Sequence, residues 1–331
     1  MLYFVLKYIT RLGFFFYCKR VIVEGLENIP KKGAVIFTPN HQSAFMDAIL
    51  PAVMLPRDIH FLARADIFKS KWAGKILTKL HIRPVYRQRD GLRETLKNIE
   101  VFEGCNELLR AGGWLLMFPE ASQSMVRRVR PLSKGFTRIA FGALASAEED
   151  VNLYIIPMGI NYEHYSASNA VIRMRLGSPI LVNEYLEEYQ ENPTSAARKL
   201  TKETSNGMKK VCLHISEAEE TKWFGDVPYR GVELTDPDFF QKDEQAKLKI
   251  KKFGPAFLVK LMHLPVYLIL RWILTFKVKD PHFQPSIKFA VALFLVPIYY
   301  IVILIFGNLF DFEFVAAILV SIAFLSFFTQ K

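Results

Sequence analysis

Residues 34–47 read AVIFTPNHQSAFMD, and the fold is deduced outward from this stretch. The apolar residues 34–37 are typical of a buried strand, and the pattern of residues 47–54 predicts a helix. His41 then lies in the loop between strand and helix, with Asp47 in the first helical turn. Six positions along a regular helix turn by about 240°, so the two side chains can meet only if His41 lies in that loop.

His41 and Asp47 form a candidate catalytic pair. Histidine can take a proton from a hydroxyl near neutral pH. A carboxylate behind the ring can fix its tautomer and stabilise the imidazolium that forms. A helix-capping loop with a surface histidine explains the same segment equally well, so the pair needs support from the rest of the chain.

Strand and helix candidates alternate on either side of this pair. Hydrophobic pattern and turn residues predict strands at 21–23, 34–37, 60–62, 114–118, 153–156 and 171–176. They predict helices at 47–54, 73–80, 92–110, 135–145 and 196–215. This alternation predicts an α/β fold in which a sheet is layered with helices.

A basic region follows the predicted His41 loop. From Arg57 to Arg93 there are ten Lys or Arg against three Asp. Arginine and lysine bind phosphate, so the region suits a phosphate, a CoA or an anionic lipid surface. Arg87 comes directly after a strand-like apolar element, in the segment IRPVYR at 82–87, and is the best single candidate there for a ligand contact.

Two later strands also end in residues of interest. The strand expected at 114–118 is followed by Pro119 and Glu120. Open α/β sheets place their sites at the carboxyl ends of strands, so Glu120 is a candidate partner for an acceptor hydroxyl or a basic side chain. A solvated turn carboxylate is the alternative. Residues 156–160, IPMGI, are again a strand interrupted by proline.

Taken together and in this order, these segments resemble the glycerolipid acyltransferase family, which includes lysophosphatidate and glycerol-3-phosphate acyltransferases. Asn40-His41-Gln42-Ser43 with Asp47 is similar to the family's first block, and residues 82–87 to its second. Phe118-Pro119-Glu120 is similar to the third, and residues 156–160 to the fourth. Lys134, before Gly135 and Phe136, also fits the pattern, and the resemblance covers about residues 20–215.

The resemblance implies an oxygen acyl transfer in phospholipid biosynthesis. An acyl-CoA or an acyl carrier protein would donate the fatty acyl group to a hydroxyl of glycerol-3-phosphate or lysophosphatidate. His41 would act as general base and Asp47 would orient it, with no metal, cofactor or residue nucleophile required. The implied substrate-binding residues are Arg83, Arg87, Glu120, Ser122 and Lys134.

The chain departs from the family pattern at two places. Five residues separate His41 from Asp47, where four are usual. The third block usually continues Gly-Thr-Arg, but here it continues Ala121-Ser122-Gln123. The missing arginine leaves two interpretations open. A later arginine at 127, 128 or 130 substitutes for it, or the acceptor is a different lipid, such as a lysophospholipid or an aminolipid.

The composition indicates contact with lipid. Hydrophobic residues make up 51% of the 331 residues, aromatic residues 14%, and the net charge is +11. A basic charge suits a nucleic acid, an anionic membrane or an anionic substrate. No nucleic-acid-binding motif is present in the sequence, so we expect no nucleic-acid partner. A non-catalytic lipid-binding protein on the same scaffold is a further alternative. The three cysteines show no metal-binding spacing.

Four regions are expected along the chain. The pattern of residues 1–19 predicts a helix that lies in the membrane interface. Residues 20–240 are expected to form the acyltransferase domain. Residues 241–252 form a charged linker, and residues 253–331 a membrane-associated region. That region holds an interfacial helix and two uncharged runs, 289–310 and 314–330, which predict a transmembrane hairpin. The flanking lysines 277, 279, 288 and 331 predict that both ends lie on the cytoplasmic face.

Overall fold

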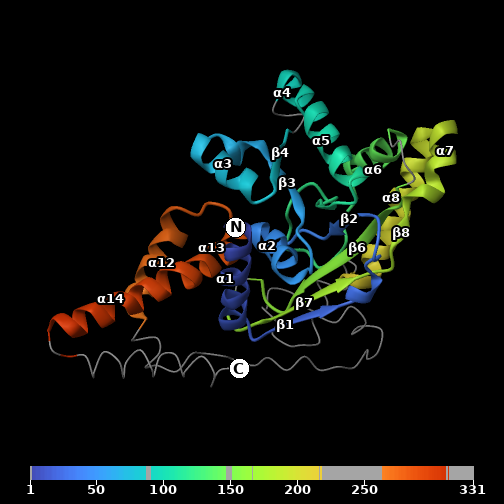
Figure 1. The fold of residues 1–331 in the computed structure, drawn as a ribbon. Coiled ribbons are helices and arrows are strands. Elements are labelled where there is room, and N and C mark those ends of the chain that lie inside the picture. The colour runs from blue at the N-terminus through green and yellow to red at the C-terminus, as the bar shows by residue number, and fades with distance from the viewer. Residues whose placement is uncertain are drawn as a thin grey trace, which may run out of the picture.

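The computed structural model describes residues 2–86, 91–146, 151–165, 167–215, 217, 263–310 and 312. The described strands form one mixed sheet with the order β1-β7-β6-β2-β5-β3-β4, and β8 also pairs with β6 (Figure 1). Their bounds are β1 Arg20–Glu24, β2 Ala34–Pro39, β3 His60–Arg64, β4 Ile82–Val85, β5 Trp114–Leu116, β6 Leu153–Tyr162, β7 Val171–Leu176 and β8 Ile180–Leu181.

The centre of the sheet is parallel. Strand β2 pairs in parallel with β5 on one side and with β6 on the other. Strands β7 and β8 pair antiparallel with different parts of β6. The carboxyl ends of β2, β5 and β6 therefore meet at one edge of the sheet, which is where open α/β sheets place their sites.

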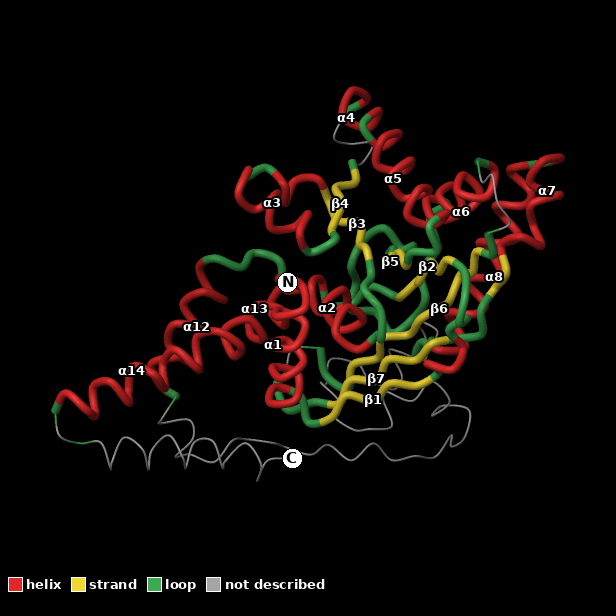
Figure 2. Tube along the Cα trace, viewed as in Figure 1, coloured by secondary structure: helices red, strands yellow, loops and turns green. Residues whose placement is uncertain are grey.

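Helices cover both faces of the sheet (Figure 2). Up to residue 211 the described α-helices are α1 Leu2–Tyr17, α2 Ala44–Met54, α3 Lys71–Lys79, α4 Leu92–Leu96, α5 Asn98–Arg110, α6 Gly135–Ala145, α7 Leu186–Glu191 and α8 Pro193–Val211. Side chains alternate along β2, as strand geometry requires. Val35 and Phe37 join a core with residues of α1 and α2, whereas Ala34 and Ile36 join a second core with α5, α6 and α8.

The C-terminal part is one long apolar helical segment. It begins with the 3₁₀ turn Pro281–Phe283 and continues through α13 Gln284–Ala290, the π-helical turn Val291–Leu295 and α14 Val296–Leu309. A separate helix, α12 Leu264–Phe276, precedes it. Among the described residues, only Pro281–Leu309 is long and apolar enough to cross a membrane, and 6% of its most apolar window is buried. The second expected run, 314–330, and the linker 241–252 lie outside the described residues.

The predicted α/β sheet layered with helices is confirmed, and the differences are local. The helix expected at 92–110 is broken at Lys97 into α4 and α5. Strand β6 runs through Pro157 to Tyr162, well beyond the expected end at residue 156. Pro157 is tolerated because it falls between the segment of β6 that pairs with β8 and the segment that pairs with β7. Strand β5 ends at Leu116 instead of residue 118.

Candidate active site

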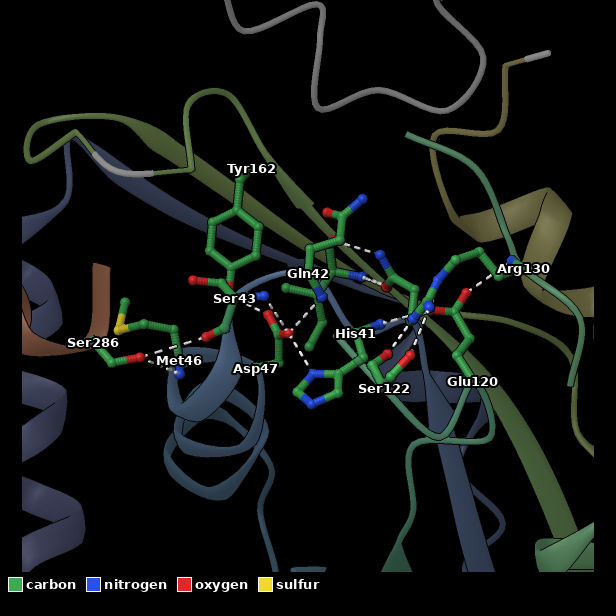
Figure 3. Close-up of polar contacts among 12 residues, drawn as sticks. His41, Gln42, Ser43, Met46, Asp47, Glu120, Ser122, Arg130, Tyr162 and Ser286 are labelled. Atoms are coloured by element: carbon green, nitrogen blue, oxygen red, sulfur yellow. Dashed lines mark hydrogen bonds and ion pairs between the residues drawn. The ribbon is translucent and has the colours of Figure 1, made fainter. Parts of the chain in front are cut away.

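Two loops and one strand end form the site. The loop after β2 carries His41 and leads into α2, and the loop after β5 carries Phe118 and Glu120. Tyr162 is the last residue of β6, on the other side of β2. Because these three strands are parallel neighbours, residues far apart in the sequence come together at the carboxyl edge of the sheet (Figure 3).

The His41–Asp47 pair is closed. Nδ1 of His41 lies 2.8 Å from Oδ2 of Asp47, within hydrogen-bond distance. The Asp47 side chain is fully buried, whereas 15% of the His41 side chain is exposed. A carboxylate that accepts at this contact selects, for the neutral imidazole, the tautomer with its proton on Nδ1 and its lone pair on Nε2.

Asp47 is held by three further donors. The backbone N–H groups of Gln42 and Ser43 donate to Oδ2, at 2.7 Å and 2.6 Å. The hydroxyl of Tyr162 donates to Oδ1 at 2.7 Å. Burial, and then the negative charge of Asp47, raise the pKa of Tyr162 well above its usual value, so this hydroxyl stays protonated and donates. The carboxylate therefore has a fixed position and orientation behind the histidine (Figure 3).

The five residues between His41 and Asp47 contain a tight turn at Ala44. Ala44, the first residue of α2, has a φ of 39°, in the left-handed region that non-glycine residues rarely adopt. This turn lets Ser43 direct its N–H toward Asp47 while the backbone enters the helix. The five-residue spacing is thus compatible with a closed pair, at the cost of local backbone strain.

The imidazole of His41 contacts the Asp47 carboxylate at its edge, through Nδ1, and an aromatic ring on one face. It stacks on Phe118, with ring centroids 4.0 Å apart and planes inclined by 19°. The backbone of the same residue is tied to the second loop, since its carbonyl accepts from the Ser124 N–H at 2.9 Å. Figure 3 shows Nε2 on the side away from Asp47, and within the described part of the chain no group hydrogen-bonds it. The ring is oriented and its basic nitrogen is available.

Glu120 is organised differently. Its carboxylate accepts from the backbone N–H of Arg130 at 2.9 Å, and from Nε and Nη2 of the same arginine at 3.2 Å and 2.8 Å. The N–H of His41 lies 3.3 Å from Oε2. Arg130 also donates to the Ser122 hydroxyl at 3.0 Å. Glu120 thus ties the two loops together, and Arg130 is its main partner.

The other two candidate arginines have separate places. Buried Arg127 donates to the carbonyls of Tyr162 and Glu163, at 3.0 Å and 3.3 Å, so it supports the end of β6. Arg128 pairs with Glu217 at 3.5 Å. Of the three arginines, only Arg130 joins the cluster around Glu120.

Two further predicted site residues, Arg83 and Lys134, lie outside this cluster. Arg83 lies on the edge strand β4, three strands from β2, with its guanidinium against Gly104 of α5. Lys134 is exposed immediately before α6. Arg87 lies outside the described residues. Substrate binding by these three residues stays a prediction.

Tyr162 and Ser286 were missed by sequence reasoning. Tyr162 lies two residues beyond the fourth block on the same strand, so it points to the same face as Ile160, and the strand pattern could have indicated it. Ser286 lies 240 positions from Met46, and no local pattern could have connected them.

The sequence is similar to those of known acyltransferases. Residues 20–161 match the family model described as Acyltransferase. Over 116 residues the chain is 28% identical to glycerol-3-phosphate O-acyltransferase 2 of Saccharomyces cerevisiae, a match that covers 35% of this chain and 16% of that protein. Over 121 residues it is 31% identical to the 1-acyl-sn-glycerol-3-phosphate acyltransferase of Bacillus subtilis, covering 36% of this chain and 56% of that protein.

A solved structure is also similar. The crystal structure of the 1-acyl-sn-glycerophosphate (LPA) acyltransferase from Thermotoga maritima aligns with 61% of this chain and 76% of that chain, with a TM-score of 0.41 and 22% identity. The curated relatives above match only in part, since the chain covers 16% and 56% of their lengths. The matched segment contains His41, Asp47 and Glu120, and ends one residue before Tyr162. Residues 20–161 are an acyltransferase domain, similar to the domains of glycerol-3-phosphate and 1-acyl-sn-glycerol-3-phosphate acyltransferases.

Proposed function

We propose that the protein transfers a fatty acyl group from a thioester to a hydroxyl of glycerol-3-phosphate or lysophosphatidate. The observation that carries this proposal is the 2.8 Å contact of His41 with buried Asp47, with Nε2 of the ring directed away from the carboxylate. This is the arrangement of a general base whose tautomer is fixed by an acid. The names of the relatives supply the substrate class.

The reaction needs one base and no residue nucleophile. Nε2 of His41 takes the proton as the acceptor hydroxyl attacks the thioester carbonyl, and Asp47 stabilises the imidazolium. The tetrahedral intermediate collapses with cleavage of the carbon–sulfur bond. The leaving thiolate then takes the proton from His41. The products are a glycerol ester and a free thiol, and the histidine returns to its starting state.

The site would operate at a membrane surface. Helix α1 packs Tyr3 and Phe14 inward but exposes large apolar residues, including Phe4, Val5, Tyr8, Leu12 and Phe15. Helix α12 exposes Tyr267, Leu268 and Trp272 in the same way. Exposed apolar helices of this kind suit a lipid interface. Together with the long helix Pro281–Leu309, they support a membrane-bound enzyme. The lysines at 277, 279 and 288 support a site on the cytoplasmic face.

The direct test is a donor and acceptor panel. The purified full chain, in mixed detergent and phospholipid, is given acyl-CoA or acyl carrier protein thioester with glycerol-3-phosphate or lysophosphatidate. Thiol release and the acylated lipid are both measured. We expect equal amounts of thiol and ester with at least one pair. Lipid binding without thiol release on any acceptor would identify a non-catalytic lipid-binding protein instead.

A second candidate acceptor is favoured by one contact. Gln123 occupies the place of the missing arginine, and its Nε2 donates to the carboxylate of Asp280 at 3.2 Å. The backbone N–H and then the ring of His282 lower the pKa of Asp280, so this carboxylate is negative at neutral pH. A negative charge at this place disfavours a phosphate monoester. A lysophospholipid with a zwitterionic headgroup or an aminolipid would be accepted there more readily. When both are added to the acceptor panel, transfer to these acceptors alone would establish this alternative.

A further inference from the structure

The C-terminal helical segment lies against the catalytic loop. Phe283 packs edge-on against Phe45, with ring centroids 5.5 Å apart, and Asp280 accepts from Gln123. Helix α13 then runs past the start of α2, as Figures 1 and 3 show. This segment lies more than a hundred residues beyond the end of the family match at residue 161. It therefore adds to the site something that the matched domain does not contain.

Ser286 makes a second polar contact between the two parts. Its hydroxyl accepts from the Met46 N–H at 3.3 Å and lies 3.5 Å from the Ser43 carbonyl, to which it donates. Only 7% of the residue is exposed. A buried helical serine commonly bonds a carbonyl of its own helix. The hydroxyl of Ser286 instead bridges two backbone groups more than 200 positions away.

The two bridged groups flank the tight turn described above and also bond each other, since the Met46 N–H donates to the Ser43 carbonyl at 2.9 Å. Ser286 therefore reinforces this bond from the side of the C-terminal segment. Ser43 and Met46 lie on either side of Ala44, whose φ is 39°. A non-glycine residue in this region is strained and persists only where its surroundings hold it. Ser43 also donates its own N–H to Asp47, and Met46 immediately precedes Asp47. Whatever holds this turn therefore holds the carboxylate behind His41.

Ser286 is itself held in place by apolar packing. Phe289, one turn further along, packs against Phe14 and edge-on against Tyr17 of α1, with ring centroids 4.6 Å and 5.3 Å apart. Gly13 of the same helix allows a close approach, since a Cβ there would meet Leu293 at 2.6 Å. Helices α1 and α13 thus form one unit, and that unit continues into the exposed apolar helix α14.

We propose that Ser286 is a positioning residue for acyl transfer. By bridging Ser43 and Met46 it stabilises the turn at Ala44 and aligns Asp47 with His41. The alignment of the pair then depends on docking of the C-terminal apolar helix, so the site is fully assembled only when that helix is in place. This inference rests on the proposed function of His41 and Asp47.

The test compares Ser286→Ala with two matched variants in the full chain. Ser286→Ala should lower kcat about tenfold and leave KM for donor and acceptor unchanged, because only alignment is lost. Ser286→Thr keeps the hydroxyl and should recover most of kcat. Ser195→Ala removes a hydroxyl from α8, where it donates to Glu188, and should leave kcat unchanged.

A spectroscopic measurement reports the alignment of Asp47 with His41 and does not require turnover. In protein labelled with ¹⁵N-histidine, the Nδ1 proton of His41, assigned with the His41→Ala variant, should give a sharp low-field resonance. Ser286→Ala should broaden it or move it upfield, and Ser195→Ala should not. An unchanged resonance and kcat in Ser286→Ala, or equal loss in the Ala and Thr variants, would overturn the inference.

The two proposals can fail separately. Wild-type turnover in His41→Ala would contradict the proposed function whatever Ser286 does. An inactive His41→Ala beside a fully active Ser286→Ala would remove only the positioning role.

Discussion

The loops after β2 and β5 are each fixed by a buried carboxylate, Asp47 at the start of α2 and Glu120 in the second loop, but the two carboxylates serve different purposes. Asp47 receives four hydrogen bonds, one of which comes from a histidine ring that keeps its other nitrogen available. Glu120 is equally well satisfied, yet its donors are Arg130 and the His41 backbone. Burial and hydrogen bonding alone do not distinguish the two carboxylates. The identity of the donors distinguishes them. The histidine ring at Asp47 assigns proton transfer to the first loop, and the arginine at Glu120 assigns a structural role to the second.

The strongest way to break this contrast is Asp47→Asn. An amide cannot fix the histidine tautomer or stabilise the imidazolium, and its NH₂ group would meet donors that now meet a carboxylate. We expect kcat to fall on the order of 10²–10⁴-fold. Turnover would be measured beside the unfolding temperature of the same preparation. A well-folded variant within threefold of wild-type kcat would contradict the assignment of Asp47.

The second loop should respond mainly in stability. Glu120→Gln leaves the Arg130 guanidinium without its carboxylate, and we expect the free energy of unfolding to fall by about 1.5–3 kcal/mol. Denaturant unfolding in detergent would measure this change. Exchanging Arg130 for methionine in the same chain should recover part of the loss, because no unpaired charge is left.

The outcome for kcat sharpens the same contrast. Glu120→Gln should reduce kcat less than Asp47→Asn does, since Glu120 reaches the reaction only through the position of the loop. A larger kcat loss in Glu120→Gln than in Asp47→Asn would reverse the roles given to the two loops.

Tyr162→Phe tests the support of Asp47 from the neighbouring strand. The hydroxyl donates to Oδ1, on the far side of the carboxylate from His41, so three donors remain after its removal. We expect a loss of about 1.5–3 kcal/mol in unfolding free energy, as for a hydrogen bond to a charged group. We expect a several-fold fall in kcat, measured in the same assay. An unchanged stability would show that Asp47 does not need this strand.

The smallest effect is expected at Ala44→Gly. Glycine adopts a positive φ without a steric penalty, but it also increases the entropy of the unfolded chain and here removes a buried methyl group. These effects oppose one another, so the unfolding free energy should change by less than about 1 kcal/mol. Thermal unfolding would measure it. A large loss would mean that the turn is held by the Ala44 side chain instead of by its backbone contacts.

The strand, loop and helix that carry the catalytic pair could be predicted from the sequence because their residue patterns are local. The strand at 34–37, the loop position of His41 and the first-turn position of Asp47 follow from patterns within fifteen residues, and the structure confirms them. Pro157 suggested a strand end, but pairing on either side of it carries β6 on to Tyr162. The residue pattern of one strand does not show which neighbouring strands pair with it in the sheet.

The contacts of Glu120 and Ser286 could not be predicted for the same reason. Arg130 was one of three arginines in a loop without regular periodicity, and only the folded loop selects it for Glu120. Ser286 lies in an apolar segment where a serine gives no signal, and its partners are backbone groups. Contacts of this kind depend on tertiary packing, and the spacing of residues in a single sequence does not reveal them.

The central claim is that His41 is the base that activates the acceptor hydroxyl. The most direct measurement is the rate of thiol release by His41→Ala, compared with the wild-type chain at equal folded concentration and saturating donor and acceptor. We predict a fall on the order of 10²-fold or more, with the unfolding temperature little changed. A folded His41→Ala protein that releases thiol and forms ester at the wild-type rate would contradict the claim.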